Sequence, residues 1–255
     1  VQALVIGQLN GVGMGARDAS HFMAKRLHDA FQVHGDDGFI LDHHNPAAQG
    51  AAHVVLGALL RDWNYLGLVM IGGCSMVGFF VYMASSPFVF IDYYGLSPLM
   101  YSLSYSFNAV AFIGAAQLTG LLGERFGLVR VVKAAANAAG VVTLVLLGYY
   151  VAGGDSMWVL MGMYFISSAF MGMVIPTSSV LALEEHGAIA GTASALLGTL
   201  QMLMGALGMG IFGLFSNGKP LTMVLAMAVG ALLGVLLTWL TLGRAGAPGP
   251  VQPGH

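Results

Sequence analysis

The chain has very few charged residues and almost no cysteine. Only 8% of its 255 residues are Asp, Glu, Lys or Arg, whereas a soluble domain carries about 25%. So few charges cannot cover the surface of a soluble protein of this size. The single cysteine, Cys74, has no partner for an internal disulfide, so a disulfide framework is excluded. The net charge of -2 gives no basic surface, and we expect no nucleic-acid partner.

Hydrophobic residues, in contrast, make up 57% of the chain and stand in long runs. A helix needs about 20 apolar residues to cross a bilayer. The runs are continuously apolar rather than alternating, which favours helices over barrel strands. The sequence therefore predicts an all-α membrane protein, a six-transmembrane-helix bundle over residues 56–243 with the lipid bilayer around it. The six uncharged runs are Trp63–Ile91, Tyr93–Gly123, Ala134–Gly154, Ser156–Leu183, Gly187–Gly218 and Pro220–Gly243.

The basic residues predict how the bundle is oriented. If the N-terminus lies inside, only Lys219 falls on the outer side. Basic residues gather on the cytoplasmic side of membrane proteins, so we expect an N-in, C-in topology. The eight basic residues on the inner side are then Arg17, Lys25, Arg26, Arg61, Arg125, Arg130, Lys133 and Arg244.

The two ends of the chain differ from the bundle. Residues 1–55 are rich in histidine and glycine, and we expect a polar, poorly structured cytoplasmic segment. Residues 244–255 are expected to form a flexible cytoplasmic tail. The first residues, Val1–Leu9, are short and lack a basic start, so no cleavable signal peptide is predicted. A start at valine suggests a fragment of a longer protein, and an aberrant N-terminus is an open alternative.

A cluster of histidine and aspartate residues in the first segment raises the question of a metal site. Adjacent histidines do not share one helical face, and the spacing matches no zinc pattern. We therefore predict no metal and no cofactor. A membrane metalloenzyme using this cluster remains the least favoured alternative. The residues concerned are His34, Asp36, Asp42, His43 and His44.

Three motifs carry a resemblance to a known family. Residues 84–98 read ASSPFVFIDYYGLSP, residues 188–201 read AIAGTASALLGTLQ, and residues 120–130 read GLLGERFGLVR. Together they resemble the C-terminal half of drug:proton antiporters of the bicyclomycin/chloramphenicol-resistance (Bcr/CflA) type. These belong to the major facilitator superfamily. The resemblance covers about residues 56–242, and the third motif resembles a loop that recurs throughout the superfamily.

The resemblance implies proton-coupled efflux of amphipathic drugs or small molecules, without enzymatic activity, from a bacterial inner membrane. Such transporters have twelve spans in two halves, and this chain has six. The implied partners are therefore protons, a small amphipathic substrate, and either a missing N-terminal six-helix half or a second copy. Alone, the chain would be inactive. A non-transporting binding or regulatory remnant in the membrane is the alternative.

The third motif places charges on both sides of a glycine. Arg125 and Arg130 flank Gly127, which suits a tight turn between the second and third spans. In the family such a loop holds neighbouring helix ends together, and Glu124 is placed to pair with either arginine. The alternative is that these charges only set the topology.

Glycines recur every seven residues in the fifth span, at Gly191, Gly198 and Gly205. Seven residues are close to two helical turns, so the three lie on one face where another helix can approach closely. By the resemblance this face joins the two halves. Packing within this half is the alternative.

Two prolines and one aspartate are candidates for transport steps. Pro87 and Pro176 interrupt the first and fourth spans and predict helix kinks, which in transporters often line cavities. Tolerated structural kinks are the alternative. Asp92 is a candidate for proton coupling, although a place in outer solvent or as a cap of the next helix is favoured.

Polar side chains at membrane depth are the candidates for the substrate path. Such groups are costly in hydrocarbon and usually face a cavity or a partner. In the superfamily the first, second, fourth and fifth helices of this half line the central path, while ordinary interhelical hydrogen bonds are the alternative for any one residue. The candidates are Tyr82, Tyr105, Asn108, Tyr164 and Gln201.

Overall fold

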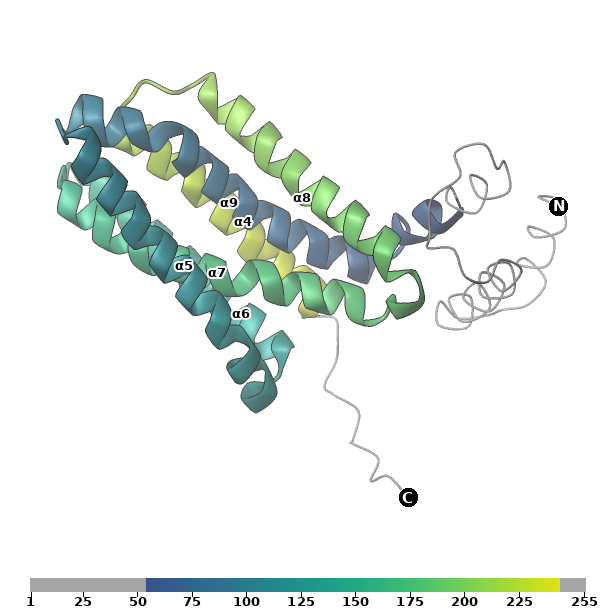
Figure 1. Ribbon diagram of the computed structural model, residues 1–255. Coiled ribbons are helices and arrows are strands. Elements are labelled where there is room, and N and C mark those ends of the chain that lie inside the picture. Colours follow the sequence, from purple (N-terminus) through teal and green to yellow (C-terminus); the bar gives the residue numbers. More distant parts are fainter. Residues whose placement is uncertain (1–53, 244–255) are drawn as a thin grey trace, which may run out of the picture.

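The computed structural model describes residues 54–243, and every regular element in that range is a helix (Figure 1). Six of these helical segments are long and apolar enough to cross a membrane. The predicted fold class is confirmed, while its orientation stays a prediction. The long elements are α4 (Trp63–Pro87, continued by the π-helix Phe88–Tyr93), α5 (Pro98–Phe126), α6 (Leu128–Val151), α7 (Met157–Glu184), α8 (Ala190–Gly213) and α9 (Pro220–Leu242).

The helices pack as two similar sets of three. Helix α4 packs against α7, α8 and α9, and helix α7 packs against α4, α5 and α6, while α6 and α9 pack against each other. The packing is symmetric. Replacing α4 by α7, α5 by α8 and α6 by α9, and the reverse, gives the same list of main contacts between helices. Within the described bundle, α5 and α8 therefore each lie mainly against one long helix, and Figure 1 shows α8 along one edge.

The exposure of α5 and α8 is much greater than that of the other long helices. Only 17% of the most apolar stretch of each is buried, compared with 39–50% in the other four spans. In both helices the exposed side chains are largely apolar, such as Phe107 and Val110 on α5 and Leu203 and Leu207 on α8. These two faces are covered in the native protein by lipid or by another protein.

Two ends of the bundle can be distinguished. We call the end where α4, α6 and α8 begin the basic end, because Arg61, Arg125, Arg130 and Lys133 lie there. The opposite end is the tyrosine end, with Tyr93, Tyr94, Tyr149 and Tyr150. Aromatic side chains are enriched at the borders of the membrane, so the tyrosine end lies near an interface.

Side-chain caps explain where two of the helices begin. The Asp62 carboxylate accepts bonds from the backbone N–H groups of Asn64 (2.9 Å) and Tyr65 (3.2 Å), which have no partner inside α4. The Ser97 hydroxyl accepts from Met100 N (3.3 Å) at the start of α5, and Pro98 occupies the first turn, where its missing N–H costs nothing. Ser97, rather than Asp92, caps this helix.

The loop predicted between the second and third spans is almost entirely helical. Helix α5 continues through Glu124 and Arg125 to Phe126, and α6 begins at Leu128 instead of near Ala134. Only Gly127 is non-helical, with φ 85°, a left-handed backbone that favours glycine. The tight turn predicted at Gly127 is confirmed. The uncharged run that starts at Ala134 begins later than its helix, because charged side chains at helix ends can reach water without ending the helix.

The two prolines lie in different surroundings. Pro87 is the last residue of α4, and the backbone continues directly into a π-helix. Pro176 lies inside α7, which runs unbroken to Glu184. The hydroxyls of Ser178 and Ser179 both donate to Ile175 O beside it, at 3.0 and 2.8 Å. The predicted role of these prolines as kinks in transport remains a prediction.

The core consists of two clusters with small residues between them. One cluster lies toward the basic end and includes Tyr65, and the other lies toward the tyrosine end and includes Tyr82. Residues 54–59, a short helical segment before α4, add Val55 and Leu59 to the first cluster, so the bundle begins slightly before residue 56. The rest of the predicted segment 1–55 and the tail 244–255 lie outside the described residues.

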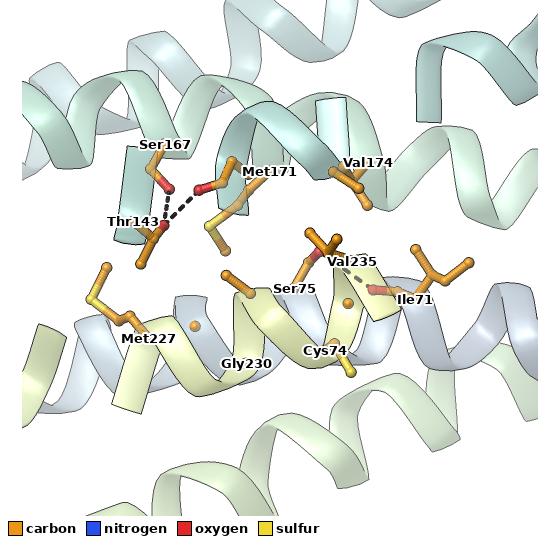
Figure 2. A pocket seen from close by; sticks show the side chains of 15 residues that line it. Ile71, Cys74, Ser75, Thr143, Ser167, Met171, Val174, Met227, Gly230 and Val235 are labelled. Atoms are coloured by element: carbon orange, nitrogen blue, oxygen red, sulfur yellow. Dashed lines mark hydrogen bonds between the residues drawn. The ribbon is translucent and has the colours of Figure 1, made fainter. Parts of the chain in front are cut away.

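A cavity of about 30 Å³ lies between α4, α6, α7 and α9 (Figure 2). Thr143 and Ser167 share a hydrogen bond of 3.2 Å on one side of it. Gly230 of α9 approaches α4 closely, because a Cβ there would stand 3.2 Å from Cys74 O. Small residues thus bring α4 and α9 together at the centre, as in other membrane helix pairs.

Candidate functional site

Four of the five predicted path residues meet in one cluster, which we call the tyrosine–asparagine cluster. It consists of Tyr82 of α4, Tyr105 and Asn108 of α5, and Tyr164 of α7. The Tyr82 and Tyr164 rings are stacked, with centroids 3.6 Å apart, and the Tyr105 ring lies nearly parallel at 6.1 Å from Tyr82. Three helices from both halves of the pseudo-repeat therefore build one site.

Asn108 carries the unusual hydrogen bonding of this cluster. Its side-chain amide donates to Tyr82 OH (3.2 Å) and to Ser104 O (3.1 Å). Its carbonyl oxygen is buried and accepts no hydrogen bond from any described residue, although the side chain is only 6% exposed. An unpaired buried acceptor costs roughly 1–3 kcal/mol. The cluster thus contains a buried acceptor that a ligand with a donor group would satisfy.

Gln201, the fifth candidate, lies elsewhere. Its side chain reaches from α8 into the space beside Gly72 of α4, near Ser178 of α7, and it is 4% exposed. Its amide nitrogen is also buried with no partner among the described residues. Ten residues of α4 separate Gly72 from Tyr82, which corresponds to about 15 Å along the helix. The predicted set is therefore two separate polar positions.

Aromatic rings connect the cluster to the tyrosine end of the bundle. Phe90 lies between Tyr82 and Tyr94, with centroid distances of 6.4 and 6.3 Å. Tyr101, whose hydroxyl bonds Ser86 (2.8 Å), lies 6.2 Å from Tyr105. The rings form a continuous aromatic wall, a surface on which apolar and aromatic molecules bind well.

Asp155 lies next to this wall at the tyrosine end of the bundle, and the sequence analysis does not predict a role for it. Tyr93 OH donates to one carboxylate oxygen (2.6 Å) and Tyr94 OH to the other (2.7 Å), while Tyr94 OH also bonds Tyr150 OH (2.8 Å). The bonds from Tyr93 and Tyr94 lower the pKa of the Asp155 carboxyl. A single acid in a short turn gives no signal in the sequence, because its partners are about 60 residues away.

We expect Asp155 to make the stability of the fold depend on pH in the acid range. Its folded-state pKa is depressed, so the ionised carboxylate stabilises the fold at neutral pH, and this contribution disappears as pH falls below about 4. Asp155→Asn should therefore lower the melting temperature at pH 7 and make it less dependent on pH between 5 and 3. Melting curves of both proteins across that range test this. Equal acid dependence would show that the two tyrosine bonds do not depend on the charge.

Asp92, the predicted proton-coupling candidate, lies at the same end. It is exposed in the π-helix, and no described basic residue lies within 4 Å of its carboxylate. The structure thus places it at the surface, as favoured from sequence, and a coupling role stays a prediction.

The glycine face of α8 divides into two parts. Gly205 is buried against Phe80 and Met76 of α4, whereas a Cβ at Gly191 or Gly198 would meet nothing within 4 Å. One end of the face therefore packs inside this bundle, and the other end is open for a further helix.

The motif around Gly127 lies on the helix ends at the basic end. Glu124, Arg125 and Arg130 are all exposed, and within residues 54–243 no ion pair joins them. The expected pairing of Glu124 with an arginine is therefore not formed in this bundle. The role of the motif remains a prediction.

Among residues 54–243 no three metal-ligating side chains come together. The histidine–aspartate cluster considered above (His34, Asp36, Asp42, His43 and His44) lies outside the described residues.

Comparison with known proteins agrees with this architecture. Residues 36–209 match the sequence profile of the Major Facilitator Superfamily. The chain belongs to the major facilitator superfamily. An uncharacterised MFS-type transporter of Bacillus subtilis (strain 168), YdgK, is 31% identical over 207 residues, covering 81% of this chain and 51% of the relative. The chain thus spans about half the length of this curated relative.

Membership in the superfamily makes this chain a multi-pass membrane protein of a transporter family. The match also begins at residue 36, inside the segment that we predicted to be separate from the bundle. In this bundle the tyrosine–asparagine cluster is formed by residues of α4, α5 and α7, and the helices α5 and α8 are the most exposed.

Proposed function

We propose that this chain is a six-helix half of a proton-coupled exporter of amphipathic small molecules, of the Bcr/CflA drug-antiporter type, in a bacterial inner membrane with its basic end in the cytoplasm. The observation that carries the proposal is the tyrosine–asparagine cluster. It combines stacked aromatic faces with one unpaired buried acceptor, Asn108 Oδ1, at membrane depth. Such a site suits an apolar molecule with a few hydrogen-bonding groups.

The chemistry of the cluster restricts the substrate. All six acidic residues of the described range lie at helix ends or in turns: Asp62, Asp92, Glu124, Asp155, Glu184 and Glu185. A substrate in the cluster therefore meets tyrosine faces, hydroxyls and the Asn108 carbonyl, and no opposite charge. Amphipathic molecules with aromatic groups and hydroxyl, amide or amine donors fit this environment.

The exposed faces of α5 and α8 support a second six-helix half as partner. The Asn108 and Gln201 side chains lie on these two helices, and α8 presents an open face at Gly191 and Gly198. A partner on these faces, either the N-terminal half of such a transporter or a second copy, would pack against the two helices that carry these polar side chains, which are buried inside this bundle. Proton coupling would then use acidic groups of the partner, because the interior of this half has none among residues 54–243.

The proposal is tested by measuring transport in membrane vesicles that contain the chain. The chain alone is expected to give no efflux of a fluorescent amphipathic compound. Co-expression with the part of the Bacillus subtilis relative that the match leaves uncovered should restore efflux, and a protonophore should abolish it. An unrelated membrane protein of equal expression is the control partner. Full activity of the lone chain when its dimers are blocked would contradict the half-transporter proposal.

A non-transporting binding or regulatory remnant is the competing function. It predicts stable insertion of the bundle and no substrate-dependent proton uptake with any partner. The same vesicles decide between the two, because only a transporter half moves protons when substrate is added.

A further inference from the structure

Four tyrosines gather near the Asp155 carboxylate at the tyrosine end of the bundle. Tyr93 and Tyr94 lie at the end of the π-helix that follows α4, and their hydroxyls each donate to one carboxylate oxygen, at 2.6 and 2.7 Å. Tyr149 and Tyr150 belong to the last turn of α6, and Tyr150 OH bonds Tyr94 OH at 2.8 Å. Asp155 itself lies in the turn between α6 and α7. The carboxylate is thus held in position by uncharged phenol groups.

The tyrosine rings stand as walls beside this carboxylate. The Tyr93 and Tyr94 rings are perpendicular, at 89° with centroids 4.9 Å apart, and Tyr93 is 44% exposed. The Tyr149 and Tyr150 rings form a second right angle, at 87° and 5.4 Å. Tyr149 also lies against the turn that carries the acid, since a Cβ on Gly154 would meet its ring carbons. The face of an aromatic ring is negative, so these walls attract a positively charged ligand.

The negative charge of Asp155 has no counter-ion among residues 54–243. Lys219 is the one basic residue that this range has at the tyrosine end, and it forms no ion pair with the carboxylate. The bonds from Tyr93 and Tyr94 lower the pKa of the Asp155 carboxyl, so it is ionised at neutral pH. The side chain is exposed, and its two oxygens keep acceptor sites beyond the two that the tyrosines use.

We propose that Asp155 and the tyrosine rings beside it form a binding site for an organic ammonium group. The carboxylate supplies the opposite charge, and the rings cover the carbon atoms that surround the nitrogen. A metal ion fits less well, because no three metal-ligating side chains come together within residues 54–243. The ammonium group can belong to a soluble cation or to a lipid headgroup such as phosphatidylethanolamine. The site is separate from the tyrosine–asparagine cluster, and the proposal goes beyond the proposed transport function and does not rest on it.

Saturation-transfer NMR with tetramethylammonium tests the site directly, using the full chain in nanodiscs of phosphatidylglycerol, a lipid without an ammonium group. Saturation of the tyrosine ring protons passes to a cation bound on the rings, and titration of the probe gives its affinity. Asp155→Asn removes the charge at nearly the same size, Tyr93→Leu removes one wall, and Tyr93→Phe keeps that wall. Asp92→Asn is the matched control, because Asp92 is an exposed acid next to Tyr93 without tyrosine bonds. All variants are compared below their melting transitions.

Asp155→Asn should weaken binding of tetramethylammonium roughly fivefold, as expected for the loss of an exposed charge pair. Tyr93→Leu should weaken it roughly threefold, and Tyr93→Phe by less, because phenylalanine keeps the aromatic face. Asp92→Asn should bind like the wild type.

Unchanged binding by Asp155→Asn would overturn the proposal, and so would an equal loss in Asp92→Asn, because a diffuse surface charge would then hold the cation. Equally strong binding of tert-butanol, a neutral molecule of similar shape, would also contradict it. Phosphatidylethanolamine added to the nanodiscs identifies the source of the ammonium group. Competition with the probe at Asp155 supports the site with a lipid headgroup as its occupant, whereas unchanged probe binding supports it with a soluble cation.

Discussion

Gly172→Ala is expected to destabilise the bundle by about 3 kcal/mol, because α5 and α7 touch backbone to backbone at this position. A Cβ on Gly172 would lie 2.2 Å from Phe112 O and 2.9 Å from Phe112 C. Backbone atoms cannot rotate away as a side chain can, so α5 must move off α7. Asn108 and Tyr105 lie on α5 and Tyr164 lies on α7, so the same shift should also open the tyrosine–asparagine cluster.

The single cysteine provides the measurement. Cys74 is 3% exposed and is the chain's only thiol, so a thiol-reactive fluorogenic dye reports unfolding during heating in detergent. Gly162→Ala is the matched control on the same helix, because a Cβ there meets nothing within 4 Å. It should leave stability unchanged or raise it by about 0.5–1 kcal/mol. If Gly172→Ala reacts with the dye at the wild-type temperature, the close α5–α7 contact is absent in the membrane protein.

The sequence was sufficient to predict the class and number of the helices in the bundle, because both follow from composition. A run of 21 or more residues without charge has few alternatives to a membrane helix. The helix ends were harder to predict, as Lys133 illustrates. The uncharged run begins at Ala134, yet α6 begins six residues earlier, at Leu128. Hydropathy measures where a helix lies in the membrane, whereas capping and backbone conformation decide where it ends.

The arrangement of the candidate site could be predicted only in part. The sequence singles out polar residues at membrane depth, and four of them meet in the structure because their helices α4, α5 and α7 pack together. Their role in a substrate path stays a prediction. Nothing in the sequence separates Gln201 from that group, since its neighbours Gly72 and Ser178 are distant in the chain. Asp155 and Gly172 were missed for the same reason. Their importance comes from partners on other helices, Tyr93 and Phe112.

Asn108→Leu is expected to leave stability nearly unchanged while it reduces transport. Leucine removes the buried carbonyl oxygen that has no partner, together with the amide that bonds Tyr82 and Ser104. Removing the unpaired oxygen is favourable, whereas the buried Tyr82 hydroxyl loses its hydrogen bond from Asn108 at a similar cost of roughly 1–3 kcal/mol, so the two effects offset each other. The free energy of unfolding should therefore change by less than about 1 kcal/mol. Transport by the reconstituted pair should fall roughly tenfold, the effect of losing about 1.4 kcal/mol of substrate hydrogen bonding.

Asn137→Leu is the matched comparison, because this asparagine is also on a membrane helix but is fully paired. Its amide bonds Lys133 O (2.6 Å), and its carbonyl accepts from Trp239 Nε1 (3.1 Å), which joins α6 to α9 away from the cluster. Losing these bonds should lower stability by about 0.6 kcal/mol, a typical value for such bonds in membranes, and leave transport per folded molecule unchanged. Dye-detected melting and vesicle efflux, measured on both variants, give the two effects separately. An unpaired buried group kept at a cost in stability is explained by a ligand that pairs with it. If Asn108→Leu lowered stability and left efflux intact, Asn108 would be a structural residue and the substrate would bind elsewhere.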